Sequence, residues 1–317
     1  MVSLFMTTKK LTIISPVYNE EKNLMVFFSV LKNTIEQFKE KFLIEVNFVN
    51  DGSTDNSLKV CQQIKKGNSF VNIISLTRNF GHQNAILSAL KTISSDLYLV
   101  LDSDLQQDPK NIKTILENFQ TNDVNIIQMQ KKYKNYESVI KRIFSRFFYF
   151  FFETFTKIEI RKGSSDFYLI TRKVRDQIIK SNISYHFLRG FIHWSGFSKL
   201  YISYIPKRRI HGKSKYVFFN QLEFALTGVY YYQSKFFIYL FILSLFLFFA
   251  ALIYIFYIIY SYYFLDAIKQ TGWSTLVIAL LFFGSMITLL NSFIIFIIMK
   301  IFYFVSNKPN FIIDDDK

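Results

Sequence analysis

The sequence has only one cysteine, Cys61, among its 317 residues. A single thiol excludes an internal disulfide and a cysteine-rich metal site, and its position in an expected helix favours a packing role. The four histidines lack metal-ligand spacing as a group. We therefore expect them to pack or to form hydrogen bonds, with His211 as the strongest candidate for a chemical role.

Several familiar motifs are also missing. Neither the GxGxxG pattern nor the P-loop pattern GxxxxGK[ST] occurs, which weighs against a Rossmann dinucleotide site and a P-loop. No recognised nucleic-acid-binding motif is found, and nucleic acid is not an expected partner. The first residues contain no long apolar run, so no cleaved signal peptide is expected.

Charge is unevenly distributed along the chain. The formal net charge is +15, and the residues before position 236 carry all of it. A basic globular part can face nucleic acid, an anionic membrane surface or phosphorylated substrates. The apolar segments that follow favour the membrane and the phosphate.

Two long segments contain no charged residue, 236–265 and 273–299. Each exceeds the roughly 20 residues that cross a bilayer as a helix. We predict transmembrane helices at 236–265 and 273–305. Lysines and arginines crowd residues 199–235, whereas the loop 266–272 holds one of each sign, so the positive-inside rule predicts a plasma-membrane protein with both termini cytoplasmic.

The first half of the chain alternates short apolar runs with amphipathic helical patterns. Strands are predicted at 11–17, 43–49, 71–76, 97–101 and 124–129, and helices at 20–38, 55–66, 83–93 and 109–119, the last opened by its proline. This alternation predicts an α/β fold with a mainly parallel sheet flanked by helices. Two basic or aromatic segments, 137–157 and 216–235, are expected to be interfacial helices. The catalytic domain would span 1–215, and 306–317 would be a cytoplasmic tail.

The clearest chemistry follows the fourth predicted strand, where Asp102 and Asp104 stand two residues apart. Both carboxylates can reach one small volume there, where repulsion would raise the pKa of one of them. A divalent cation removes the repulsion, and oxygen ligands favour Mg²⁺ or Mn²⁺, which would hold a nucleotide diphosphate. Taken alone, the pair also fits a cap on the next helix.

Polar patches follow the first three predicted strands as well. They read PVYNEE at 16–21, NDGSTD at 50–55 and TRNFGHQNA at 77–85. Ligands of such sheets bind where loops leave the carboxyl ends of the strands, which favours the metal interpretation of the aspartate pair. Further along come DSDLQQDP at 102–109, SDFYLITRKV at 165–174, RG at 189–190 and RIHGKSKY at 209–216.

On this set of motifs the chain resembles glycosyltransferase family 2 with a GT-A fold. Within it, the chain is similar to the polyisoprenyl-phosphate glycosyltransferases, such as dolichol-phosphate mannose synthase and bactoprenol glucosyltransferase. The resemblance implies an inverting, metal-dependent hexosyltransferase that moves a sugar from a nucleotide sugar to undecaprenyl phosphate. The motifs leave UDP versus GDP open, and we favour UDP. The sugar and the downstream glycan stay open, and so does a homo-oligomer.

The resemblance also implies residue roles. It assigns nucleotide binding to Pro16, Tyr18, Glu20, Asp51, Arg78 and Asp102. The Mg²⁺ or Mn²⁺ ion and the diphosphate fall to Asp102, Asp104 and Gln106. The reacting centre would involve Asp104, Asp166 and Arg209. The acceptor phosphate would be bound by Arg142, Arg146, Arg209, Ser214 and Lys215.

The chain departs from the family pattern at three places. Asn50 stands where many members have aspartate, the segment 165–170 lacks the usual arginine, and Pro206 replaces an arginine of some relatives. These differences concern acceptor-side charge and nucleotide contacts.

Two other functions stay open. A processive polysaccharide synthase would resemble its relatives in a QxxRW motif, which is absent. A non-catalytic membrane scaffold would have no need of an intact Asp102-Ser103-Asp104 and Arg209.

Overall fold

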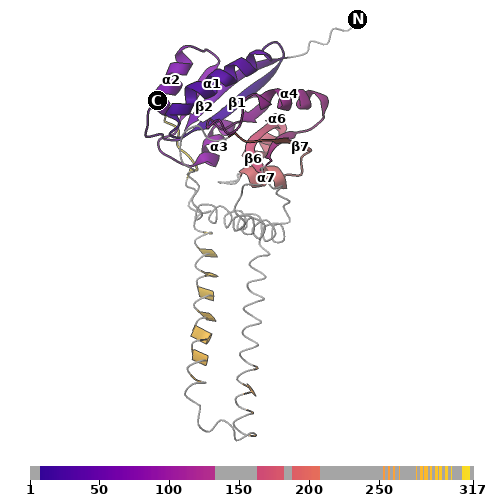
Figure 1. Ribbon diagram of the computed structural model, residues 1–317. Coiled ribbons are helices and arrows are strands. Elements are labelled where there is room, and N and C mark those ends of the chain that lie inside the picture. Colours follow the sequence, from indigo (N-terminus) through magenta and orange to yellow (C-terminus); the bar gives the residue numbers. More distant parts are fainter. Residues whose placement is uncertain are drawn as a thin grey trace. The chain divides into compact units, whose positions relative to one another are not determined.

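The computed structural model describes residues 8–132, 163–181, 188–207 and 309–314, with scattered positions between 253 and 301 (Figure 1). The chain divides into two compact units. One consists of Met1–Gly228 with Asn310–Lys317, and the other is Val229–Pro309. The first unit contains the sheet and its helices.

The described sheet has seven strands in the order β3-β2-β1-β4-β6-β5-β7. They are β1 (Lys9–Val17), β2 (Phe42–Asn50), β3 (Val71–Ser75), β4 (Leu97–Val100), β5 (Ile126–Lys131), β6 (Ser164–Thr171) and β7 (Lys199–Tyr204). Strands β1 to β4 pair in parallel, β6 runs antiparallel to β4 and β5, and β7 is parallel to β5. The mainly parallel α/β sheet is thereby confirmed.

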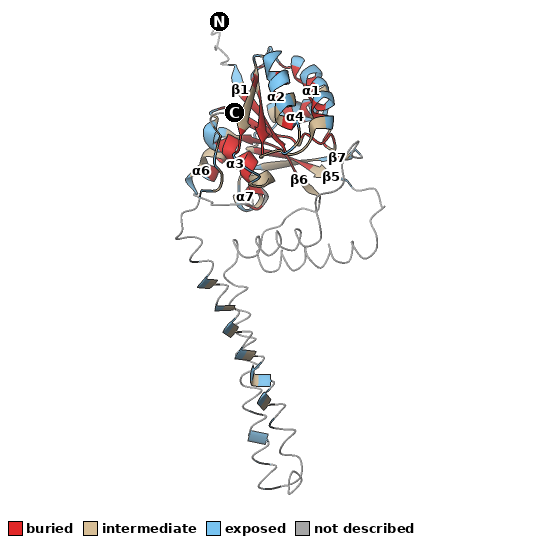
Figure 2. Ribbon diagram, turned by 90° about the vertical axis from the view of Figure 1, so that its left-hand side faces the viewer, coloured by how far each residue is buried: buried red, intermediate tan, exposed pale blue. Residues whose placement is uncertain are grey.

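Helices cover both faces of the sheet (Figures 1 and 2). They are α1 (Glu21–Glu36), α2 (Ser57–Lys66), α3 (His82–Thr92), α4 (Asn111–Thr121), α6 (Arg172–Lys180) and α7 (Leu188–Trp194). Strand β1 shows why there are two apolar layers. Leu11 and Ile13 lie in the core shared with α1, α2 and α4, and Ile14 lies in the core shared with α3, α6 and α7. Successive strand side chains point to opposite faces, so an apolar run with both faces covered is buried throughout.

The predicted elements of the first half are present with small shifts. Helix α4 begins at Asn111, two residues after Pro109, because the backbone N–H of Asn111 bonds to the carbonyl of Asp108 in a preceding turn, at 3.0 Å. Cys61 is fully buried in α2, as its packing role predicts, and burial raises the pKa of its thiol to about 12.

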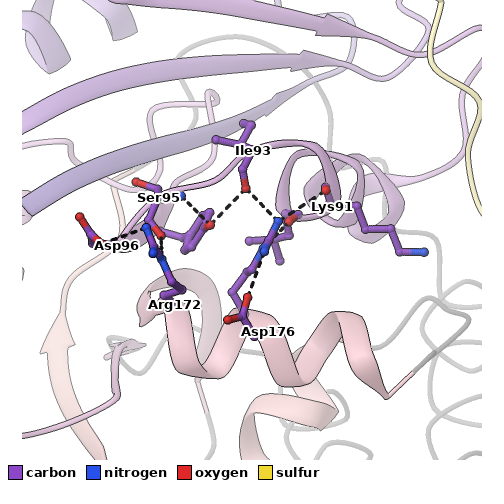
Figure 3. Close-up of polar contacts among 9 residues, drawn as sticks. Lys91, Ile93, Ser95, Asp96, Arg172 and Asp176 are labelled. Carbon is purple, nitrogen blue, oxygen red and sulfur yellow. Dashed lines mark hydrogen bonds and ion pairs between the residues drawn. The ribbon is translucent and has the colours of Figure 1, made fainter.

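Helix α3 is fixed at its carboxyl end by arginines of α6 (Figure 3). Arg175 donates to the carbonyl of Leu90 at 2.7 Å and to that of Ile93 at 3.0 Å. Arg172 donates to the carbonyl of Ser95 at 2.9 Å. The last carbonyls of a helix lack partners within it, and arginine side chains satisfy them here. Arg172 of the SDFYLITRKV motif and Arg175, one residue after its end, therefore anchor the end of α3 and the loop that follows it.

The C-terminal tail joins the edge of the sheet at β3. Leu76 and Ile313 form an antiparallel bridge. The N–H of Thr77 bonds to the carbonyl of Ile312 at 3.1 Å, and that of Asp314 bonds to the carbonyl of Ser75 at 2.8 Å. Phe311 and Ile313 pack on the core beneath α3 and α6. The tail therefore belongs to the same unit as the sheet.

Several predicted segments lie outside the described residues. These are the helices at 137–157 and 216–235 and most positions of the two predicted spans, 236–265 and 273–305. Among the positions that are described, no helix combines the length and the apolar character needed to cross a membrane.

Candidate functional site

The carboxylates of Asp102 and Asp104 lie in the turn after β4, at the carboxyl edge of the parallel strands. Ser103, between them, donates its hydroxyl hydrogen to the carbonyl of Pro16 at 3.0 Å. This bond fixes the turn against the end of β1, where the PVYNEE motif begins. Two of the sequence-predicted patches therefore meet at one edge.

Two glutamines and a strained leucine complete this turn. Gln107 donates Nε2–H to Asp102 Oδ2 at 2.6 Å, and its Oε1 accepts the N–H of Asp102 at 2.9 Å. Asp104 Oδ1 accepts the backbone N–H of Gln106 at 3.0 Å. Leu105 has a φ of 62°, a left-handed conformation that costs roughly 1–2 kcal/mol. Strain of this kind persists where surrounding bonds fix the backbone, as they do here.

Asp166 lies across from this turn. The antiparallel register pairs Val100 of β4 with Tyr168 of β6. Continuing this register two residues forward from Val100 and two residues back from Tyr168 places Asp102 opposite Asp166. The side chain of Asp166 is only 6% exposed. A residue predicted to bind the nucleotide and a residue predicted to form the reacting centre therefore lie close together.

His82, at the start of α3, lies between these two carboxylates. Its Nε2 is 3.3 Å from Asp102 Oδ1 and 3.5 Å from Asp166 Oδ2. The neighbouring Gln83 donates Nε2–H to Asp166 Oδ2 at 3.0 Å. No feature of the sequence singles out Gln83, and His82 is expected from it only to pack or to form hydrogen bonds.

Asp51 is held by the loop after β3. Its Oδ1 accepts the backbone N–H of Phe80 at 2.7 Å, and its Oδ2 accepts that of Gly81 at 3.0 Å. Arg78, in the same loop, is exposed and stacks its guanidinium 4.4 Å from the centre of the Phe80 ring. The loops after β2 and β3 thus form one wall beside the site.

The loops after β1 and β2 are also tied together. Asn19 adopts a φ of 55°, and its Oδ1 accepts the N–H of Thr54 at 2.8 Å. The N–H of Glu20 donates to the hydroxyl of Ser57 at 2.8 Å. Tyr18 and Glu20 are both half-buried in this junction. The nucleotide residues expected from PVYNEE and NDGSTD are therefore on adjoining loops.

The departure at Asn50 has a structural explanation. Its Nδ2–H donates to the Ser75 hydroxyl at 2.9 Å, and its Oδ1 accepts the N–H of Ser53 at 3.1 Å. The side chain is buried, and an amide supplies both a donor and an acceptor without a charge. Asn50 therefore shapes the loop that presents Asp51.

Burial and crowding of carboxylates set the protonation of the site. Burial raises the pKa of Asp102 to about 6, with Asp104 and Asp166 adding to the rise and His82 and Lys131 opposing it. Burial also raises the pKa of Asp51, against the hydrogen bonds from Phe80 and Gly81. Carboxylates held this way are stabilised by any cation that enters.

The donor set fits a divalent cation shared with a substrate. Asp102 Oδ1 is buried and has the ion-pair contact from His82 Nε2 at 3.3 Å, but it accepts no hydrogen bond of ordinary geometry from any described residue. Within the described ranges, no three His, Cys, Asp or Glu side chains group around a metal position. Magnesium sites with one or two carboxylates commonly complete their shell with substrate phosphates. Asp102 and Asp104 suit such a site.

The segment after β7 begins beside the same turn. The backbone N–H of Lys207 donates to the carbonyl of Gln106 at 3.0 Å. Its Nζ lies 2.7 Å from Asp108 Oδ2. Burial raises the pKa of Asp108, but the hydrogen bonds from Lys207 and Lys110 outweigh burial and leave it lowered. All five residues predicted to bind the acceptor phosphate lie outside the described residues: Arg142, Arg146, Arg209, Ser214 and Lys215.

Comparison with known proteins identifies a protein family whose model matches this chain. The family model described as "Glycosyl transferase family 2" matches residues 12–180. An uncharacterized glycosyltransferase of Bacillus subtilis, YkcC, is 29% identical over 302 residues, which are 95% of this chain and 92% of that protein. The bactoprenol glucosyl transferase of Shigella phage SfV is 27% identical over 222 residues, 69% of this chain and 71% of that protein.

Proposed function

Because this chain belongs to glycosyl transferase family 2, we propose that it transfers a sugar from a UDP-linked donor to polyisoprenyl phosphate at the cytoplasmic face of the plasma membrane. The observation that carries the proposal is the meeting of Asp102, Asp104 and Asp166 at the carboxyl edge of the sheet. This edge is where α/β sheets bind ligands.

Donor binding uses the loops after β1, β2 and β3. We assign the nucleotide to Pro16 at the end of β1 and to four residues on these joined loops, Tyr18, Glu20, Asp51 and Arg78. Asp102 and Asp104 would hold a Mg²⁺ or Mn²⁺ ion, with Gln106 beside them. When bound, such an ion neutralises charge on the departing nucleoside diphosphate.

The acceptor needs little help to become a nucleophile. The second pKa of a phosphate monoester is about 6, so it is largely dianionic near neutral pH. A phosphate oxygen would attack the anomeric carbon directly, the bond to the diphosphate would break, and the configuration would invert. Arginine forks suit the acceptor phosphate, and Arg142, Arg146 and Arg209 are the candidates, with Ser214 and Lys215.

The lipid acceptor is supported from two sides. A matched relative is named a bactoprenol glucosyl transferase. Lys207, two residues before Arg209, is bonded to Gln106 in the turn that carries Asp104. Lys207, the last described residue before the RIHGKSKY segment at 209–216, therefore lies beside the turn that we assign to the donor diphosphate.

Membrane attachment is supported by the second unit and by the tail. Described helical positions of the second unit expose large apolar side chains. Among them, the exposed fractions of Ile253, Phe256 and Phe264 are 70%, 69% and 74%. Large exposed apolar surface is unusual in water. Because the tail pairs with β3 of the unit that carries the site, the chain between 208 and 309 must cross any membrane an even number of times. Two spans satisfy this condition.

The test is a panel of nucleotide sugars, each incubated with purified full-length protein, Mn²⁺ and undecaprenyl phosphate. We expect one sugar to appear on the lipid phosphate, with loss of transfer in EDTA. A free oligosaccharide used as well as the lipid phosphate would contradict the proposal.

A further inference from the structure

The four residues 80–83 contact three aspartates, namely Asp51 after β2, Asp102 after β4 and Asp166 on β6. The backbone of Phe80 and Gly81 binds Asp51, which follows β2. The side chains of the next two residues face the carboxylates that follow β4 and lie on β6. The segment therefore links the nucleotide wall to the reacting centre.

We propose that Gln83 and His82 are positioning residues that fix the carboxylate of Asp166 beside Asp102 for the chemical step. This inference rests on the proposed function, since it assigns the two side chains a part in that reaction. Neither residue need touch the substrate, because both act through Asp166.

The contact of Gln83 is directed at Asp166. An ionised carboxylate only accepts hydrogen bonds, so the amide must present its nitrogen, which lies 3.0 Å from Asp166 Oδ2. Gln83 Oε1 is buried and accepts no hydrogen bond from the described part of the chain. Asp166 is 6% exposed, so water cannot readily replace a lost donor.

His82 adds a second contact on the same oxygen. Its Nε2 stands 3.5 Å from Asp166 Oδ2 and 3.3 Å from Asp102 Oδ1, which places one ring between two mutually repelling carboxylates. Helix α3, which carries both residues, is held at its other end by Arg175. The helix therefore offers a fixed frame, and the orientation of Asp166 follows from it.

The test compares Gln83→Leu with Gln62→Leu in the full-length protein. Gln83→Leu keeps the bulk and removes the donor, whereas Gln62 is exposed on α2. We expect Gln83→Leu to lower kcat roughly 10- to 100-fold, the effect of one lost hydrogen bond to a buried charge. The KM for the nucleotide sugar should change less than about twofold, because backbone atoms hold Asp51. His82→Gln, which keeps an N–H donor, should retain more activity than His82→Leu.

Other results overturn the inference. A kcat for Gln83→Leu equal to that of Gln62→Leu, or a raised KM with kcat unchanged, would show that Asp166 needs no such support. If wild-type protein transfers no sugar to polyprenyl phosphate, the proposed function fails. The positioning role is then tested by comparing crystallographic or cryo-EM maps of the wild type and of Gln83→Leu. A rotated Asp166 carboxylate in Gln83→Leu would support the positioning role, and an unmoved one would end it.

Discussion

Gly52 lies directly against the backbone of Arg78. A Cβ atom at Gly52 would stand 2.3 Å from the carbonyl carbon of Arg78 and 2.5 Å from the nitrogen of Asn79. The φ of Gly52 is +61°, which also favours glycine. Asp51 receives its two backbone hydrogen bonds from this same neighbouring loop. The approach of two loops therefore sets the position of a proposed nucleotide ligand.

Gly52→Ala should weaken nucleotide binding at least about tenfold, because backbone cannot yield as a flexible side chain does. Calorimetric titration of UDP with Mn²⁺ measures this. Gly67→Ala is the matched control, since its Cβ would meet nothing closer than 3.9 Å. Equal affinities in the two variants would separate Asp51 from nucleotide binding.

Asp102→Asn should stabilise the metal-free protein at pH 7 while it abolishes transfer. The folded protein holds a proton on Asp102 up to a pKa of about 6, whereas the unfolded chain releases it near 3.8. Ionisation in this window therefore costs the folded state, and stability falls as pH rises from about 4 to 6. Melting curves in EDTA across this range should show a smaller fall for Asp102→Asn than for wild type.

Asp108→Asn should change the stability of the folded protein in the opposite direction to Asp102→Asn. The pKa of Asp108 is lowered in the folded protein, so its charge contributes stability at pH 7 that is lost as pH falls. This variant should therefore melt lower than wild type at pH 7. A higher melting temperature for it, or a lower one for Asp102→Asn, would contradict the assigned pKa directions.

Ile313→Asp should destabilise the first unit by about 1–2 kcal/mol, because it places a charge where Ile313 packs beside β3. Ile312→Asp is the control on the adjacent residue, whose side chain is 50% exposed. Thermal unfolding of the two full-length variants gives the comparison. If both melt alike, the tail does not add to the sheet edge.

Lys207→Met should raise the KM for the lipid phosphate by up to about fivefold and leave the KM for the nucleotide sugar unchanged. The lysine is 60% exposed and pairs with Asp108, so the ion pair contributes at most about 1 kcal/mol. Its loss would loosen the chain at Lys207, the last described residue before the predicted acceptor residues. Lys113→Met, which removes the exposed pair with Glu117 at 3.9 Å, is the control and should change neither constant.

The elements that the sequence predicts well are those with a strong local pattern. Strand β1 reads as a mainly apolar run, LTIISPV at 11–17, and Asp102 and Asp104 stand out because their spacing is itself local. The role of His82 has no local signal. Its contacts exist because β6 pairs antiparallel with β4, which brings Asp166 opposite Asp102 over a long sequence separation.

Gln107 escaped prediction for a related reason. The left-handed φ of Leu105 reverses the turn, and this reversal brings the Gln107 amide, next to the predicted Gln106, onto Asp102. The pairing of Ile313 with Leu76 likewise joins residues far apart in sequence, and only the folded chain reveals it.

The assignment of Asp102 and Asp104 to the diphosphate can be tested by mass-spectrometric detection of lipid-linked sugar made by the full-length enzyme and by Asp104→Ala. The reaction contains the preferred nucleotide sugar, Mn²⁺ and undecaprenyl phosphate. Wild type should form the glycosylated lipid phosphate, and Asp104→Ala should form none above background. Full turnover by Asp104→Ala would contradict the assignment of the two aspartates after β4 to the diphosphate.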